Sequence, residues 1–248
     1  MTVTSSTTDR FALRMPPDVR SVRIGDHQVV LIDDFLEDPQ ALLAEARASR
    51  FEPYPKQSAH KGYPGVRAEA PADYTANLVQ LVEPLIKLNF KVPEDLPLHK
   101  SICAFSLTTM PPDTLGPLQR TPHFDASTPY HMAVLLYLCD GQHGGTGFYR
   151  HKATGIQQVT HANRDDYIDC YREELERRPP PARYFDRGDE HFDFLGMLPA
   201  KFNRLVVYPG SLLHSACINP SISLSSDPMR GRLTLNSFFD FGIAPPAP

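Results

Sequence analysis

The pattern of apolar and polar positions gives the first part of the chain a strand followed by two helices. Residues 28–36 (QVVLIDDFL) are rich in β-branched and aliphatic side chains and predict a strand. Residues 38–49 place apolar side chains at helical spacing after Asp38, a candidate N-cap, and predict a helix. Residues 72–90 predict a second helix, kinked or broken near Pro84.

After about residue 100 the pattern changes to short apolar runs bounded by turn residues. These runs predict strands and turns at 101–110, 131–140, 145–155, 204–216 and 232–241. A charged helix is predicted at 163–178, with Asn163 as its N-cap, and residues 51–71 have the composition of an ordered loop. This order of elements favours helices packed on one side of an antiparallel β-sandwich or barrel.

The length of 248 residues allows one large domain or two small ones. We expect a disordered lead over 1–20 and a single domain over 21–248, with a helical insertion at about 160–200. The insertion could serve as a lid, as the contact of a homodimer, or as both.

Composition excludes several classes of partner. The net charge of −4 gives no reason to expect nucleic acid, and no apolar run approaches the roughly 18 residues of a membrane helix. The first residues lack the apolar segment of a signal peptide. The four cysteines form no CxxC pair, which favours free thiols in a cytoplasmic protein over a zinc knuckle.

The triplet His-Phe-Asp occurs twice, at 123–125 and at 191–193. Residues i and i+2 of a strand point the same way, with Cβ atoms roughly 6–7 Å apart, so either triplet has the spacing of two metal ligands. The composition alone makes about one His-x-acid triplet expected by chance. The surroundings of each triplet therefore have to decide between them.

Those surroundings favour the first triplet. His191 lies in a polar segment after three prolines, which is typical of a loop histidine. His123 and Asp125 precede the most apolar run of the chain, and a later predicted strand ends at His214. Two histidines and one carboxylate form the facial triad that leaves positions open on Fe(II). The sequence thus predicts a metal site at His123, Asp125 and His214.

Four segments carry a resemblance to a known family: HFD at 123–125, LLYLCDGQHGGTGFY at 135–149, RLVVYPGSLLHSA at 204–216 and RLTLNSFFDF at 232–241. They resemble the 2-oxoglutarate- and Fe(II)-dependent oxygenases, in particular the prolyl-hydroxylase-like branch. The resemblance implies an α+β, mainly β fold, a double-stranded β-helix (jelly roll) with the N-terminal helices packed on one sheet.

The implied reaction uses Fe(II), 2-oxoglutarate and O2, and hydroxylates an unactivated C–H bond of an amino acid, peptide or protein side chain. Succinate and CO2 are its other products. Because Asp125 supplies a carboxylate ligand, the resemblance favours hydroxylation over halogenation, in which that carboxylate is replaced.

The resemblance also implies roles for residues around the metal. Arg232 would pair with the distal carboxylate of 2-oxoglutarate, since a guanidinium matches a carboxylate bidentately. Tyr137 and Thr234 would contact the same carboxylate. The gap between His214 and Arg232 is longer than is usual in the family, which leaves Arg230 as an alternative to Arg232.

Candidates for binding the substrate are weaker: Arg150, Asn236 and Arg67. The other histidines are expected to be ordinary surface or turn residues, with His143 the one to check; they are His131, His143, His151 and His161. Two hypotheses compete with the oxygenase: a cupin-like protein that binds a metal or small molecule without catalysis, and a zinc hydrolase or isomerase. Only the oxygenase needs a carboxylate clamp deep in the fold.

Overall fold

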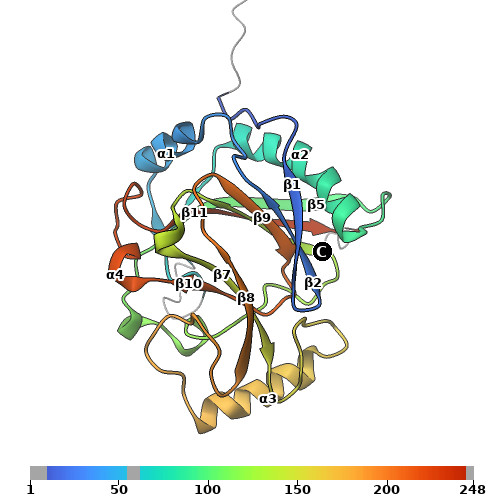
Figure 1. Cartoon of the computed structure of the whole chain (residues 1–248), viewed down its shortest axis with the longest axis vertical. Helices are drawn as coiled ribbons and strands as arrows, with labels where there is room; N and C mark the ends of the chain where they lie inside the picture. The colour runs from blue at the N-terminus through green and yellow to red at the C-terminus, as the bar shows by residue number, and fades with distance from the viewer. Residues whose placement is uncertain (1–9, 55–61, 244–248) are drawn as a thin grey trace, which may run out of the picture.

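Strands dominate the chain, and helices are few (Figure 1). The strands are β1 (Val19–Ile24), β2 (His27–Ile32), β3 (Glu52–Pro53), β4 (Gly65–Glu69), β5 (Leu98–Thr108), β6 (His131–Tyr137), β7 (Gly144–His151), β8 (Phe192–Pro199), β9 (Arg204–Pro209), β10 (His214–Ile218) and β11 (Leu233–Phe241). The helices are α1 (Pro39–Ala48), α2 (Ala72–Phe90), α3 (Arg164–Arg177) and α4 (Pro220–Ser223). Single 3-10 turns occur at Pro112–Thr114, Pro117–Gln119 and Gly141–His143.

The strands form two antiparallel sheets in a computed structural model that describes residues 10–54 and 62–243. The larger sheet has the order β1-β2-β9-β6-β11-β5-β4-β3, and the smaller has the order β10-β7-β8. The expected mainly β class with few helices is confirmed. In the described part of the chain no helix has both the length and the apolar character of a membrane span.

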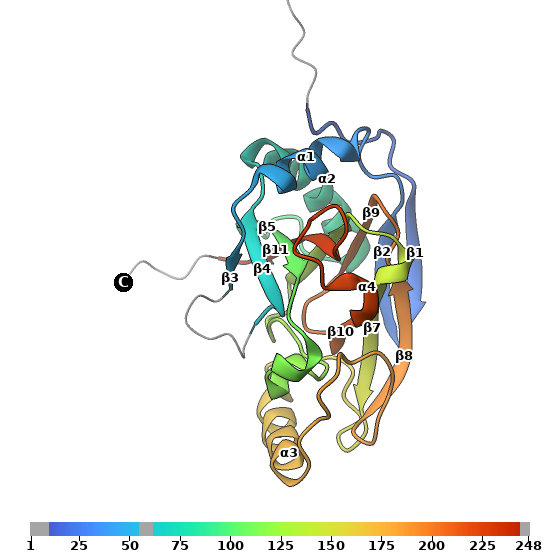
Figure 2. The same cartoon turned by 90° about the vertical axis from the view of Figure 1, so that its left-hand side faces the viewer.

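Helices α1 and α2 lie together on one face of the larger sheet, while α3 lies at the opposite end of the molecule (Figures 1 and 2). Leu42 and Ala46 of α1 and Leu78 of α2 are fully buried against that face. Asp38 caps α1 as predicted, since its carboxylate accepts a hydrogen bond of 3.0 Å from the backbone N–H of Gln40.

Strand β6 has an unbroken apolar sequence because both of its faces are covered. Val134 and Leu136 face the helices, whereas Leu135 and Tyr137 pack in a second core that includes Phe148 of the smaller sheet. A strand buried on both faces shows a continuous apolar run instead of alternation. The two sheets thus enclose an interior, and the inner face of the larger sheet looks into it.

The register of the larger sheet sets a polar row on this inner face. Arg67 of β4 lies opposite Ser106 of β5, Ser106 lies opposite Thr234 of β11, and Thr234 lies opposite Tyr137 of β6. Residues directly opposite one another on neighbouring strands point to the same face. Side chains from four strands therefore meet along one line inside the molecule.

Strands at the sheet edges, or next to an edge in the case of β4, escaped prediction. β1 and β8 were not expected, and β3 and β4 fall in the stretch 51–71 for which a loop is predicted. β1 and β3 are the edges of the larger sheet and β8 is an edge of the smaller one. An edge strand is less buried, so its apolar pattern is weak. Residues 55–61 of the expected loop lie outside the described residues.

Two further expectations are corrected. The disordered lead over 1–20 is wrong for residues 10–20, because Phe11 is buried and Leu13 bridges to Leu36; residues 1–9 lie outside the described residues. Helix α2 is not broken at Pro84. Pro84 is on the exposed side of the helix, where water can satisfy the carbonyl that proline leaves unpaired.

Candidate metal centre

The three predicted ligands come together because two segments distant in sequence are joined through their backbones. His123 and His214 form an isolated antiparallel bridge, in which each backbone N–H donates to the other's carbonyl at 2.9 and 2.8 Å. The backbone N–H of Asp125 donates to the carbonyl of Gly210 at 2.6 Å. These bonds hold the segment of His123 and Asp125 against the turn that leads into β10.

The ligand atoms converge without bonding to one another. Nε2 of His123 lies 3.9 Å from Oδ1 of Asp125, and Nε2 of His214 lies 3.6 Å from Oδ2. These separations exceed a hydrogen bond, yet all three ligand atoms lie within 4.8 Å of one another. A cation bound at about 2 Å from each atom fits among them.

The outer side of His214 is fixed in the way that metal ligands usually are. Its Nδ1–H donates to the carbonyl of Leu212 at 2.8 Å, which leaves the lone pair of Nε2 directed at Asp125. Phe148 and Tyr208 pack around the ring, with centroids 6.5 and 5.0 Å away. These contacts fix the ring and limit the access of water to it.

The protonation states also suit a metal. Burial lowers the pKa of His214 to about 4. Burial, followed by the neighbouring His214, lowers the pKa of His123 as well, although its half-exposed side chain feels this less. Burial raises the pKa of Asp125. Neutral imidazoles are metal ligands, and a cation stabilises the charged form of a carboxylate whose pKa is raised by burial. The residues present therefore fit a divalent metal.

A cavity of about 580 Å³ opens from this centre between the two sheets. Its size is in the range of small-molecule sites. The three ligands line it together with Arg232, Arg67 and Asn236. The site is thus continuous with a chamber that can hold further molecules.

Arg232 is a buried cation with no counter-ion among the described residues. It is 2% exposed, Nη2 donates only a long 3.4 Å bond to the carbonyl of Gly145, and Nε has no hydrogen-bond partner. In the described part of the chain no carboxylate pairs with it. Arg230 is exposed, so the structure places Arg232 and not Arg230 in the cavity wall. Burying an unpaired charge is costly, which makes this guanidinium a receptor for an anion that enters the cavity.

Tyr137 and Thr234 are buried one layer behind the cavity wall. The hydroxyl of Tyr137 is 2.6 Å from that of Thr146, which lines the cavity. Thr234 donates to Oδ1 of Asn236 at 2.7 Å. Both hydroxyls thus orient residues that face the cavity, and the predicted contact of Tyr137 and Thr234 with a carboxylate stays a prediction.

The weaker candidates for substrate binding differ in whether they line the cavity. Arg67 and Asn236 line the cavity. Arg150 does not: it is exposed near the end of β7, and Nη2 pairs at 2.7 Å with Asp193 of the neighbouring strand. The structure therefore does not bring Arg150 into the cavity, and its predicted substrate role stays a prediction.

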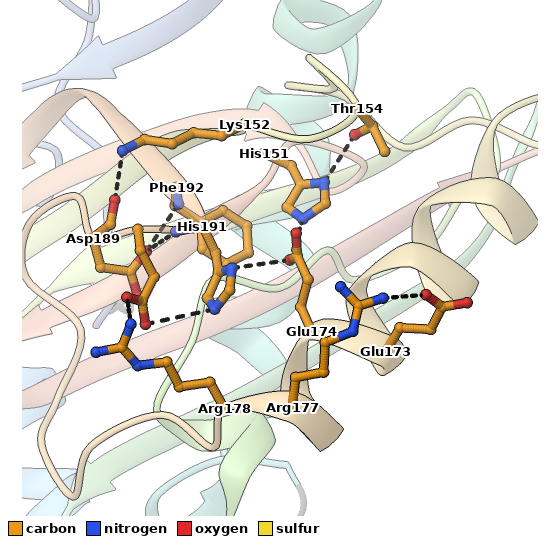
Figure 3. Close-up of polar contacts among 11 residues, drawn as sticks. His151, Lys152, Thr154, Glu173, Glu174, Arg177, Arg178, Asp189, His191 and Phe192 are labelled. Carbon is orange, nitrogen blue, oxygen red and sulfur yellow. Dashed lines mark hydrogen bonds and ion pairs between the residues drawn. The ribbon is translucent and has the colours of Figure 1, made fainter.

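His191 of the second His-Phe-Asp triplet belongs to another cluster of histidine and carboxylate side chains, shown in Figure 3. Nδ1 of His191 lies 3.2 Å from Oε2 of Glu174 on α3, and Nε2 of the fully buried His151 lies 2.8 Å from the same oxygen. The carboxylate thus ties α3 to β7 and to the start of β8. His191 lies in the loop just before β8, as expected, but its ring is largely buried against Glu174, and His151 is not a surface residue. The predicted role of α3 in a dimer stays a prediction.

Sequence reasoning also missed His131. Expected at the surface, it lines the cavity, with Nδ1 hydrogen-bonded to Asp240 and Nε2 buried without a partner. The available signal was its position two residues before Ala133, on the inner face of β6. His143 packs its Nδ1 3.2 Å from the hydroxyl of Ser223, away from the metal centre.

Two solved structures are similar to the chain over most of its length. HygX from Streptomyces hygroscopicus, in a crystal structure with nickel, 2-oxoglutarate and hygromycin B bound, is 12% identical with a TM-score of 0.45; the match covers 87% of this chain and 83% of that chain. A novel N-substituted L-amino acid dioxygenase from Burkholderia ambifaria AMMD is 11% identical with a TM-score of 0.38, covering 93% of this chain and 95% of that chain. No curated protein matches the sequence.

A sequence family also matches the chain, over residues 15–239. It is described as a family of unknown function (DUF6445). The matched range contains both sheets up to Phe239 and every residue of the candidate centre. The chain therefore belongs to the DUF6445 family.

Proposed function

We propose that this protein is an Fe(II)- and 2-oxoglutarate-dependent dioxygenase that hydroxylates an unactivated C–H bond of an amino acid, peptide or protein side chain. One observation carries the proposal. The same cavity holds a His-Asp-His donor set and, elsewhere in its wall, the buried guanidinium of Arg232, which no carboxylate of residues 10–54 and 62–243 neutralises. A metal-binding module has no need of the second feature.

The chain's own residues would divide the work as follows. His123, Asp125 and His214 would hold Fe(II) by one face and leave the other face open. Arg232 would hold the distal carboxylate of 2-oxoglutarate bidentately. Bound iron, 2-oxoglutarate and O2 together supply the oxidation of the C–H bond, with release of succinate and CO2. The apolar walls around His214 would keep water and stray reductants from the reacting atoms.

Finer features belong to the same proposal. The two facing sheets are taken as a double-stranded β-helix of the prolyl-hydroxylase-like branch, because β10 of the smaller sheet delivers His214 next to the inner face of the larger one. The four cysteines are free thiols, which is consistent with a reducing compartment such as the cytoplasm.

The test is succinate formation from 2-oxoglutarate with Fe(II), ascorbate and O2. We expect slow uncoupled turnover by the wild-type protein and none by Asp125→Ala. A parallel calorimetric titration without O2 measures 2-oxoglutarate binding to the iron-loaded protein. Absence of both turnover and binding would favour a cupin-like binding protein or a zinc enzyme.

A further inference from the structure

We propose that the substrate is a small molecule with a carboxylate group, and that Arg67 binds this carboxylate. The inference rests on the function proposed above and names the substrate class of the same cavity. It depends on a second guanidinium in the cavity wall, on how that guanidinium is held, and on the charges around it.

Arg67 reaches the cavity from the middle of β4. Its neighbour Ala68 packs in the core under α1 and α2, so Arg67 points to the opposite, inner face. It lines the cavity as the end of the polar row that includes Ser106 and Thr234. The strand β5 separates β4 from β11, and Arg67 is therefore a separate cation from Arg232.

Two aromatic rings hold the guanidinium, and no acid neutralises it. Its Cζ lies 4.8 Å from the ring centre of Tyr54 and 5.1 Å from that of Tyr63. Nε is buried and has no hydrogen-bond partner, and in residues 10–54 and 62–243 no carboxylate forms an ion pair with Arg67. The rings fix the plane of the group while its N–H donors stay available to an anion.

Tyr63, one of the two rings, is itself anchored. The hydroxyl of Tyr63 lies 2.9 Å from that of Thr108 and 3.2 Å from the carbonyl of Ser106, both on β5. Tyr63 thus cannot swing away without losing these bonds. Arg67 is held in a prepared position, which is what recognition of a ligand requires and what a solvated surface arginine lacks.

The position of Arg67 relative to the metal centre suits a substrate. Burial lowers the pKa of Arg67. Arg67 and the proposed metal ligand Asp125 line the same cavity. With Arg232 assigned to the cosubstrate, the second guanidinium remains for a second anion in the same cavity.

The charges that line the cavity favour an anion over a cation. Its basic side chains are Arg67, Arg232 and Lys100, and its carboxylates are Asp125 and Asp240. Asp125 is assigned to the metal, and Asp240 is hydrogen-bonded to His131. No carboxylate of the described wall is left to receive a cationic group, and a cavity of about 580 Å³ that also holds 2-oxoglutarate favours a small substrate.

The first experiment uses the wild-type holoenzyme. Amino acids and short peptides are compared with the same compounds amidated at the C-terminus, and the readout is succinate release above the uncoupled rate. We expect stimulation by free carboxylates and loss of it on amidation. Equal stimulation by acids and amides would overturn the assignment of substrate class and leave the proposed oxygenase function intact. Absence of any succinate, in contrast, would count against the oxygenase function itself.

The second experiment changes the anchor. Arg67→Met should raise the KM for a stimulating carboxylate by about 30-fold or more, because removing one partner of a buried charge pair costs at least about 2 kcal/mol. Arg67→Lys, which keeps the charge without the fork, should raise it less. Arg150→Gln, an exposed arginine outside the cavity, is the matched control. A rise in the KM for the cosubstrate instead of the substrate would show that Arg67 binds 2-oxoglutarate and would overturn the proposal.

Discussion

Two clusters of histidine and carboxylate lie in this molecule, and they differ in what their ring nitrogens already contact. In the cavity, Nε2 of His214 is 3.6 Å from Asp125 and forms no hydrogen bond to any residue that the structure describes. Under α3, Nε2 of His151 is 2.8 Å from Glu174, and its Nδ1 is 2.9 Å from the hydroxyl of Thr154 (Figure 3). Nε2 of His214 thus keeps an unused lone pair, whereas both ring nitrogens of His151 are hydrogen-bonded.

Proximity alone would not separate the two clusters. The possible ligand atoms of His151, Cys170 and Glu174 also lie within 4.8 Å of one another, as do those of the cavity site. A fully buried imidazole needs hydrogen-bond partners, however, and both nitrogens of His151 have found them in the protein. The comparison shows that available donor atoms, and not residue types or distances, mark a ligand site. We call the cluster of His151, His191 and Glu174 the clamp, because its contacts join α3 to β7 and to the start of β8.

The largest effect should come from removing the cavity ligands. His123→Ala and Asp125→Ala should lower metal affinity and succinate formation by more than about 100-fold, since even an outer-shell partner of a ligand is worth 10–100-fold. His191→Ala, the equivalent change in the other triplet, should keep the metal content of the wild type. Metal content after dialysis measures both. The reverse pattern would mean that the clamp is the metal site.

The next largest effect is expected from removing the guanidinium of Arg232. Arg232→Ala should raise the KM for the cosubstrate by about 30-fold or more without removing the metal, because a buried ion-pair partner is lost. Arg230→Ala changes an exposed arginine on the same loop and should leave this KM unchanged. Steady-state succinate formation at varied cosubstrate concentration measures both variants. Equal effects of the two substitutions would contradict the placement of 2-oxoglutarate.

A smaller effect, on stability, is expected from the clamp. Glu174→Ala should lower the free energy of unfolding by about 2 kcal/mol, because a buried histidine loses its hydrogen-bond partner. Glu173→Ala, one residue away, removes an exposed pair with Arg177 and should cause no measurable change. Urea denaturation of both variants, with metal content as the second readout, distinguishes a clamp from a second metal site. A loss of bound metal in Glu174→Ala would contradict the clamp.

The smallest effect concerns pH. Because burial lowers the pKa of His214 from 6.5 to about 4, the unfolded chain takes up a proton between these values that the folded chain does not. The stability of the metal-free protein should therefore be full above pH 6.5 and fall as the pH drops toward 4. Denaturation midpoints at several pH values measure this. His214→Gln should flatten the dependence, and an unchanged slope in that variant would assign the protons to other groups.

Sequence alone was sufficient where the signal is local. The helical spacing after Asp38 predicted α1, and the apolar run at 131–140 predicted the strand β6. The set His123, Asp125 and His214 was also readable, because a two-residue spacing and a strand-end histidine are patterns along the chain. The structure brings these three side chains together, while their binding of a metal stays a proposal.

Tertiary structure decided everything that depends on register between distant strands. It placed Arg232, and not the exposed Arg230, in the cavity wall, and it left Arg150 outside the cavity. It also brought His131 and Arg67 into the cavity wall. It also showed that His151 of β7 and His191 of the loop before β8 share one carboxylate of α3. The physical reason is that burial and available lone pairs are set by which strands and helices face one another, and no short stretch of sequence contains that information.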